Sequence, residues 1–202
     1  MDVKQQFYNG LIQLVIYTFA PFIWWLCTKD KEKGFFTYWI GIKKILITNR
    51  KKFIKIITLI SITSVGLIYY YIPLSTSVNI INKISVSTIG YKSVAIILIY
   101  SFLTTGLSEE VLFRGFLCKR LTEKTCFKFS NLLQGLLFGG IHGIVAFFLI
   151  GGKETTLIVL GLTTIYGWLL GYLNEKLSSG SIVPSWIMHG LTNSISLFLK
   201  II

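Results

Sequence analysis

The sequence has little charge for its size. Of its 202 residues only 14% are charged, whereas 53% are hydrophobic, and the mean hydropathy is +0.69. A soluble domain carries about a quarter of charged residues, so this chain has too little charge to cover a surface that faces water. The same composition excludes an intrinsically disordered chain, a collagen-like rod and a disulfide-stapled miniprotein. We therefore expect a polytopic membrane protein.

Cysteine and acidic residues are also scarce. Cys27, Cys118 and Cys126 have no metal-ligand spacing, and an odd number without a repeat predicts no disulfide framework, so we interpret them as small apolar side chains. Only 8 acidic residues stand against 20 Lys+Arg, which gives a net charge of +12. In a soluble protein this excess would suggest a nucleic-acid partner. Here the basic residues lie mostly between apolar runs, so orientation in a membrane explains them and no nucleic-acid partner is predicted.

The chain is rich in long apolar stretches. A transmembrane helix needs about 20 predominantly apolar residues, and six stretches reach or approach this length: Phe7–Cys27, Phe53–Leu74, Val94–Leu117, Leu132–Ile150, Thr155–Leu173 and Ile182–Leu199. The first follows a segment that contains both Asp2 and Lys4, and it is too long for the core of a signal peptide, so we expect a retained span. The predicted fold is an all-α transmembrane bundle of about six spans in the cell membrane.

The basic residues are concentrated in alternate loops. Fourteen of them lie between the first and second, third and fourth, or fifth and sixth spans, whereas five lie on the opposite side. By the positive-inside rule the basic loops face the cytosol and both termini face outward. Within the first basic loop, Phe35–Ile47 has an amphipathic pattern that favours a short interfacial helix, with an ordinary basic loop as the alternative. Residues 75–91 are polar and predict an external loop.

The third span contains charges that are costly in lipid. Glu109, Glu110 and Arg114 lie within it, and a charge at mid-bilayer costs about 2.5–3.5 kcal/mol on insertion scales. Glu110 and Arg114 are four residues apart, so they share a helical face and are expected to form an ion pair. Glu109 is rotated by about 100° from Glu110. Its carboxylate is therefore left for chemistry such as general acid–base catalysis.

Both histidines of the chain lie in predicted spans. His142 has neighbours that are expected to let another backbone approach closely, namely Gly139, Gly140 and Gly143. His189 is followed one helical turn later by Asn193. At about 1.5 Å of helix rise per residue, His142, His189 and Asn193 lie roughly 12–18 Å from the cytosolic ends of their spans. Glu109 lies at a similar depth. The sequence predicts that they meet around one pocket, and that this pocket is reached from the cytosol.

These residues resemble the motifs of the CPBP family of intramembrane proteases, which includes the CAAX prenyl endopeptidases and their bacterial relatives. The first motif reads Glu109-Glu110-Val111-Leu112-Phe113-Arg114, the second Phe138-Gly139-Gly140-Ile141-His142 and the third His189-Gly190-Leu191-Thr192-Asn193. They occur in this order on separate predicted spans, and the resemblance covers about Ser93 to Lys200. It divides the chain into residues 1–92, with two N-terminal spans, and residues 93–202, a CPBP-like core of about four spans.

The resemblance implies hydrolysis of a peptide bond in a membrane-associated peptide or protein. Glu109 with His142 would activate the attacking water, and His189 with Asn193 would hold that water or stabilise the oxyanion. The remaining motif residues would position the site: Glu110, Arg114 and Phe138. The cofactor stays unknown at this point. Glu109, His142 and His189 could ligate Zn²⁺ with one position open, whereas a metal-free mechanism, which we prefer, needs only the side chains.

Two other classes of function stay open from the sequence. Small bacterial proteins that this chain resembles are linked to bacteriocin immunity or to processing of signalling peptides, and the short chain argues against a prenylated CAAX substrate. A non-enzymatic immunity protein could use the same polar cluster to bind a toxin or its receptor. A proton or ion carrier could use it as a relay, although the spans show no inverted repeat. Besides membrane lipid and a peptide substrate no partner is predicted, and the oligomeric state is unknown.

Overall fold

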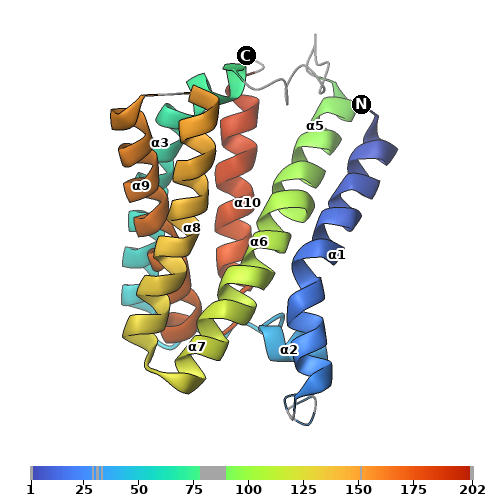
Figure 1. Cartoon of the computed structure of the whole chain (residues 1–202), viewed down its shortest axis with the longest axis vertical. Helices are drawn as coiled ribbons and strands as arrows, with labels where there is room; N and C mark the ends of the chain where they lie inside the picture. Colours follow the sequence, from blue (N-terminus) through green and yellow to red (C-terminus); the bar gives the residue numbers. More distant parts are fainter. Residues whose placement is uncertain are drawn as a thin grey trace.

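The computed structural model describes residues 2–28, 30, 32, 34–77, 90–150 and 152–200, with all their side chains except those of residues 71–77 and 150. All the regular structure in these residues is helical, which confirms the predicted all-α class. The longer helices run roughly along one axis (Figure 1). The predicted external loop over 75–91 lies mostly outside the described residues, because α3 includes residues 75–77 and the next described residue is Gly90.

In the part of the chain that the structure describes, five helices are long and apolar enough to cross a membrane, judged by length and composition. They are α1 (Val3–Cys27), α3 (Arg50–Ser77), the continuous helix Tyr91–Lys124, α8 (Phe127–Ile150), and α9 (Lys153–Tyr172) with its continuation η4 (Leu173–Leu177). The sixth predicted span corresponds to α10 (Val183–Phe198), which has 16 residues and is thus about 24 Å long. The described residues therefore form a polytopic helical bundle, as predicted.

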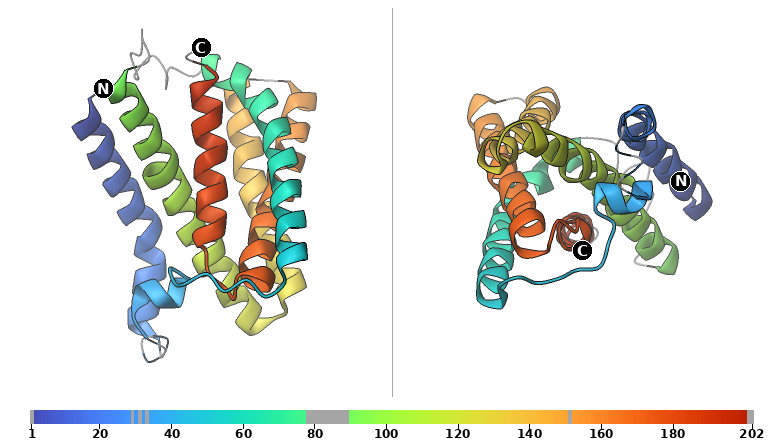
Figure 2. Two further views of the ribbon diagram at one scale, coloured as in Figure 1. Left: turned by 180° about the vertical axis from the view of Figure 1, so that it is seen from behind. Right: turned by 90° about the horizontal axis from the view of Figure 1, so that it is seen from below.

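The two ends of the bundle differ. α1 begins and α10 ends at the same end, which we call the terminal end (Figure 1). The short helices α2 (Phe36–Ile40) and α7 (Lys119–Lys124) lie at the opposite end, which we call the basic end because the loops rich in lysine and arginine are there. α10 packs between the helix Tyr91–Lys124 and α3, and it lies near the centre of the bundle when seen along the axis (Figure 2).

The helix Tyr91–Lys124 changes its winding around the two glutamates. It comprises α5 (Tyr91–Leu98), the π-helical segment η2 (Ile99–Leu107), α6 (Ser108–Glu110), the π-helical segment η3 (Val111–Cys118) and α7. In η2 the Thr105 hydroxyl donates to the carbonyl of Tyr100 five residues earlier, at 3.1 Å. π-helical turns are rare in proteins, and those that occur are often found at functional sites. α6, which contains the glutamates, is the short α-helical turn between two such segments.

Glycines allow α8 and α9 to pack closely. A Cβ on Gly139 would lie 2.7 Å from the carbonyl oxygen of Leu160, and one on Gly143 would lie 3.0 Å from the Leu160 side chain. The sequence prediction that another backbone approaches closely is confirmed for Gly139, whereas at Gly143 the close neighbour is a side chain. For Gly140 it is wrong, since a Cβ built there would meet no described atom within 4 Å apart from its chain neighbours and the nearby backbone of its own helix. A single residue step turns the side chain by about 100°, which places Gly140 away from the face that meets α9.

A strap of non-helical chain closes the basic end. The amphipathic helix expected over Phe35–Ile47 is confirmed only for α2, because Gly41 adopts the left-handed conformation (φ +98°) and ends it. From Gly41 to Asn49 the chain crosses beneath α10 (Figure 2). It is held there by backbone and side-chain hydrogen bonds, including Ile182 N–H to the Gly41 carbonyl at 2.9 Å and Thr48 N–H to the Leu177 carbonyl at 3.2 Å.

The outer surface of the bundle suits lipid. On α1, for example, Ile12, Val15, Ile16 and Phe19 are all exposed. The main apolar core lies between α3, η3, α8 and α9 in the half of the bundle near the basic end, where Phe113, Phe138, Leu170 and Leu173 are buried. Cys27, Cys118 and Cys126 are free thiols.

Candidate active site

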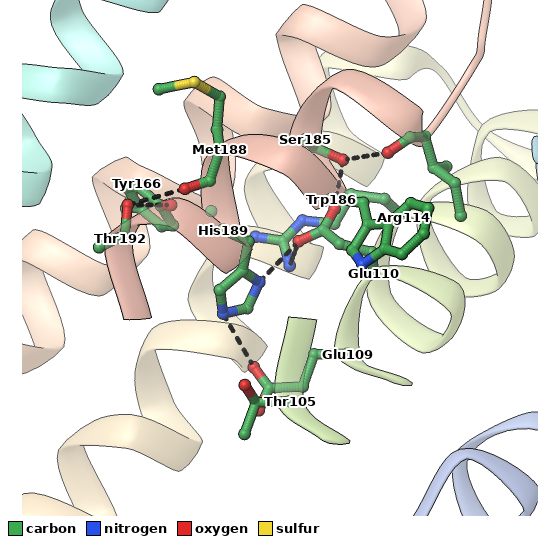
Figure 3. A network of polar contacts seen from close by, with 12 residues as sticks. Thr105, Glu109, Glu110, Arg114, Tyr166, Ser185, Trp186, Met188, His189 and Thr192 are labelled. Atoms are coloured by element: carbon green, nitrogen blue, oxygen red, sulfur yellow. Dashed lines mark hydrogen bonds and ion pairs between the residues drawn. The ribbon is translucent and has the colours of Figure 1, made fainter. Parts of the chain in front are cut away.

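Glu110 is completely buried and holds several partners at once. Its Oε1 lies 2.9 Å from Arg114 Nη1, which confirms the ion pair predicted from the spacing, and 3.1 Å from His189 Nδ1. Its Oε2 accepts a hydrogen bond from the Ser185 hydroxyl (Figure 3). A buried charge is tolerated only when it is paired and its remaining lone pairs are satisfied. The network therefore explains how a carboxylate is kept in the interior, and it fixes the ring of His189.

Arg114 and Ser185 extend this network on the side of the basic end. The guanidinium carbon of Arg114 lies 4.2 Å from the centre of the Phe138 ring, a distance suited to cation–π attraction. Phe138 of the second motif therefore packs against the guanidinium inside the bundle. The Ser185 hydroxyl also accepts a hydrogen bond from Asn174 Nδ2 at 2.7 Å. The network thus links α6, η3, α8, η4 and α10 through buried side chains.

Glu109 lies on the other side of His189, as the 100° rotation predicts. Its Oε2 is buried, 3.7 Å from Nε2 of His189 and 4.0 Å from Nε2 of His142. Both distances exceed a hydrogen bond. A polar contact of this length has room for a bridging water. The sequence prediction that the carboxylate and both imidazoles lie together is confirmed by these distances.

The hydrogen bonds of the two imidazoles indicate which nitrogen carries the proton. His142 Nδ1 lies 2.8 Å from the carbonyl oxygen of Phe138 and His189 Nδ1 lies 3.1 Å from the Glu110 carboxylate, so in each neutral ring Nδ1 is the donor. Each Nε2 then presents a lone pair toward Glu109. Three acceptors from α6, α8 and α10 converge on one small volume, and a water molecule held there can donate a hydrogen bond to two of them at a time.

Asn193 completes the predicted cluster through a residue that the motifs do not contain. Its Nδ2 donates to the Thr105 hydroxyl at 2.8 Å. Thr105 precedes Glu109 by one helical turn, so η2 and α6 present both residues to α10. An amide nitrogen carries two hydrogens, and one is engaged by Thr105. The second is available to an oxyanion in the cavity that Asn193 lines.

A cavity of about 380 Å³ connects these side chains. Glu109, His142, His189 and Asn193 all line it, together with apolar residues of α3, α8 and α10. Tyr17 of α1 and Tyr100 of η2 also form part of its wall. The two N-terminal spans, α1 and α3, therefore both contribute to the cavity, although their sequences contain none of the motifs.

The donor set has the chemistry of a zinc site but not its spacing. Ligands bound to Zn²⁺ at about 2.0–2.2 Å in a tetrahedron lie about 3.3 Å apart, whereas the Glu109 oxygen is 3.7 and 4.0 Å from the two imidazole nitrogens. Among the described residues, no group of three His, Cys, Asp or Glu side chains is arranged to hold a metal ion. As placed, these side chains do not fit the metal, so we derive no catalytic step through it.

The sequence did not predict Ser185 and Thr105 as residues of the candidate site, although their spacing from the motif residues was a usable pattern. Ser185, His189 and Asn193 follow each other at intervals of four residues, as do Thr105 and Glu109. Intervals of four residues place side chains on one helical face. Serine and threonine are common in membrane helices, however, and this one-turn spacing alone did not distinguish Ser185 and Thr105 from hydroxyls that only bond to their own backbone.

Comparison with known protein families matches residues 91–195 to the type II CAAX prenyl endopeptidase Rce1-like family. The matched region begins at the start of α5 and ends within α10, so it contains all three motifs and more than half of the 202 residues. Comparisons with curated proteins and with solved structures give no match.

Proposed function

The chain belongs to the type II CAAX prenyl endopeptidase Rce1-like family, and from this membership we propose that Glu109 and His142 activate water for hydrolysis of a peptide bond. Membership places the protein among CAAX-type intramembrane endopeptidases. The observation that carries the mechanism is the convergence of one carboxylate oxygen and two imidazole lone pairs in a cavity within the bundle.

The reaction begins with a water held between Glu109 and the two imidazoles. Glu109 takes a proton from the water, assisted by His142, while the water oxygen attacks the carbonyl carbon of the substrate. The carbonyl oxygen becomes an oxyanion, and Asn193 Nδ2 donates a hydrogen bond to it. Glu109 then returns its proton to the amide nitrogen, the carbon–nitrogen bond breaks, and an acid and an amine leave the site.

The buried network serves this reaction by positioning. Glu110 binds His189 Nδ1 and so keeps the Nε2 lone pair directed at the water. Arg114 neutralises Glu110, which prevents a second negative charge from acting on Glu109. Thr105 holds the amide of Asn193 in its orientation. Neither Glu110 nor Arg114 touches the reacting atoms in this scheme.

The decisive experiment is cleavage of membrane-anchored fluorogenic peptides by the full chain reconstituted in liposomes. We expect Glu109→Gln and His142→Ala to lower the rate about 10²–10⁴-fold, the usual contribution of a general base. Glu123→Gln is the matched control because Glu123 lies in α7 at the basic end, far from the cavity lining. Wild-type rates in both cavity variants would reject the hydrolytic mechanism.

The catalytic type requires a separate measurement. We propose the metal-free glutamate mechanism, and metal analysis of active protein together with a chelator titration tests it. Activity that is retained in protein with less than about one tenth of an equivalent of metal supports the proposal. Loss of activity in chelator that Zn²⁺ restores would assign the reaction to a metal held by Glu109, His142 and His189.

We also propose a biological setting, which is bacteriocin immunity or processing of a signalling peptide. The positive-inside rule supports an orientation with both termini outside and the basic end in the cytosol. Reporter fusions at each end test this orientation. Survival of a sensitive strain that expresses the protein tests immunity, and protection that persists in Glu109→Gln and His189→Ala would indicate a non-enzymatic binding protein instead.

A further inference from the structure

A groove on the outer surface of the bundle lies near the basic end, where α8 and α9 pack side by side (Figure 1). Its volume of about 630 Å³ falls in the range of sites that bind small ligands, roughly 300–1,000 Å³. None of its lining residues lines the cavity at Glu109. We call it the α8–α9 groove, and six residues of its wall decide what it can bind: Phe127, Lys128, Leu132, Trp168, Tyr172 and Lys176.

The apolar part of the α8–α9 groove is mainly aromatic. The rings of Trp168 and Tyr172 are stacked, with their centroids 5.5 Å apart. The ring of Phe127 lies 6.3 Å from that of Tyr172, and the Lys176 ammonium lies 4.5 Å from the centre of the Phe127 ring. Trp168 is 37% exposed and Leu132 is 49% exposed, so both present apolar surface to a chain that enters the groove. Tryptophan and tyrosine are enriched where lipid headgroups meet hydrocarbon, which is the level expected for this end of α8 and α9.

Two exposed lysines flank this aromatic surface, Lys128 in the first turn of α8 and Lys176 in η4. All eight acidic side chains of the chain belong to the residues that the structure describes, and none of them forms an ion pair with either lysine. Glu175, the neighbour of Lys176, pairs with Lys119 instead. Two such cations beside an apolar surface favour a ligand that is both anionic and apolar, because a phosphate forms charge-assisted hydrogen bonds with ammonium groups.

We propose that the α8–α9 groove binds one anionic phospholipid from the leaflet at the basic end, with its phosphate between Lys128 and Lys176 and an acyl chain along Leu132 and Trp168. Trp168 precedes Lys176 by eight residues, which is about 12 Å along the helix axis. The tryptophan therefore lies deeper in the membrane than the lysine, at the level of the acyl chain. Basic pockets between transmembrane helices bind the headgroups of anionic lipids. Binding of this lipid does not depend on the proposed endopeptidase function.

A lipid in the groove would join two elements that hold the candidate active site. α8 carries His142, whereas η4 carries Asn174, whose side-chain amide donates to the Ser185 hydroxyl. The two lysines belong to these same elements, so one phosphate bound to both connects the start of α8 to η4. A ligand that binds only the folded state stabilises it. The thermal midpoint should therefore rise with added anionic lipid.

Native mass spectrometry of the full chain in a neutral detergent counts bound lipids directly. Three ligands are titrated: phosphatidylglycerol, phosphatidylcholine with the same acyl chains, and glycerol 3-phosphate. Phosphatidylcholine controls for the acyl chains, because its ammonium group cancels the charge of its phosphate. Glycerol 3-phosphate distinguishes a lipid site from a site for a soluble phosphate, and binding of this compound as tight as that of phosphatidylglycerol would overturn the lipid assignment.

We expect the first phosphatidylglycerol to bind about tenfold more tightly than phosphatidylcholine, because a hydrogen bond between charged groups contributes at least that much. The preference should vanish when Lys128→Met and Lys176→Met are combined. It should persist when both lysines are replaced by arginine, which also binds phosphate. The matched control combines Lys51→Met with Lys55→Met, which removes two exposed lysines of α3 that lie outside the groove. Equal affinity for both lipids, or an equal loss in both methionine pairs, would overturn the inference.

Fluorescence quenching locates the bound lipid independently. Phosphatidylglycerol with brominated acyl chains quenches tryptophans that it touches, and the saturable part of this quenching should vanish in Trp168→Phe. Trp24→Phe is the matched control because Trp24 on α1 is 36% exposed, nearly as much as Trp168, and lies outside the groove. Saturable quenching that is unchanged in Trp168→Phe would place the lipid elsewhere and contradict the proposed site.

Discussion

The two sides of His189 differ in how their polar side chains are paired. Toward the basic end, Glu110, Arg114 and Ser185 are buried and each is paired with another polar group or charge. Toward the terminal end, Glu109 faces two imidazole nitrogens at distances too long for hydrogen bonds, in a cavity of about 380 Å³. The comparison teaches that the bundle pairs the Glu110 carboxylate with a cation and a hydroxyl donor, whereas the buried Oε2 of Glu109 has no hydrogen-bond partner among the described residues.

This contrast predicts that substitutions on the paired side lower stability and that substitutions on the cavity side lower activity alone. The largest effect is expected for Arg114→Ala, which leaves Glu110 charged and buried without its cation. Breaking a buried ion pair by removing one partner costs about 3–5 kcal/mol. We therefore expect a strongly reduced folded yield, measured by fluorescence-detected size exclusion, and activity should fall with it.

Glu123→Gln is the matched control for this prediction. Glu123 also forms an ion pair, with Arg120 at 3.0 Å, but the Glu123 side chain is exposed, and Arg120 keeps its second partner Asp30 at 3.2 Å. Its yield should stay within about twofold of wild type, since exposed pairs contribute roughly 0–1 kcal/mol. Equal yields for Arg114→Ala and Glu123→Gln would contradict the claim that the paired side maintains the fold.

An intermediate effect is expected where α8 packs on α9 beside the site. Gly139→Ala places a Cβ 2.7 Å from the Leu160 carbonyl oxygen, so the helices must separate at a cost of about 1–3 kcal/mol. Gly140→Ala has open space and should leave the thermal midpoint unchanged or raise it. Thermal unfolding of both variants in detergent tests this. A lower midpoint for Gly140→Ala than for Gly139→Ala would refute the packing geometry.

The paired side was more accessible to prediction from the sequence than the cavity side. The Glu110–Arg114 pair follows from helical spacing and from the cost of charge in lipid, both of which are local rules. The depth count also placed Glu109, His142 and His189 correctly at one level, because straight helices of known direction convert residue number into height.

The direction of the cavity and the residues around it could not be predicted in the same way. Whether a cavity opens toward one end depends on how far several helices diverge, and Leu149 or Tyr100 carries no local sign of that. Of the helix or basic loop expected over Phe35–Ile47, only Phe36–Ile40 is helical, because Gly41 ends the helix in a left-handed conformation and its carbonyl accepts a hydrogen bond from Ile182, which is far away in the sequence. Such features arise from packing between helices rather than from periodicity within one.

The smallest effect is expected from Thr105→Val, which tests whether positioning on the cavity side is separable from stability. Valine keeps the shape of threonine but cannot accept the hydrogen bond from Asn193 Nδ2. The hydroxyl also donates to the Tyr100 carbonyl of its own helix, which the backbone can tolerate losing. We expect kcat to fall about three- to tenfold with KM and the thermal midpoint unchanged, because the amide then meets the oxyanion less often in the right orientation. Thr105→Ser restores the hydroxyl and should restore kcat. A lower thermal midpoint with unaltered kcat would instead show that Thr105 stabilises the fold. Substitutions on the cavity side of His189 would then not affect activity alone.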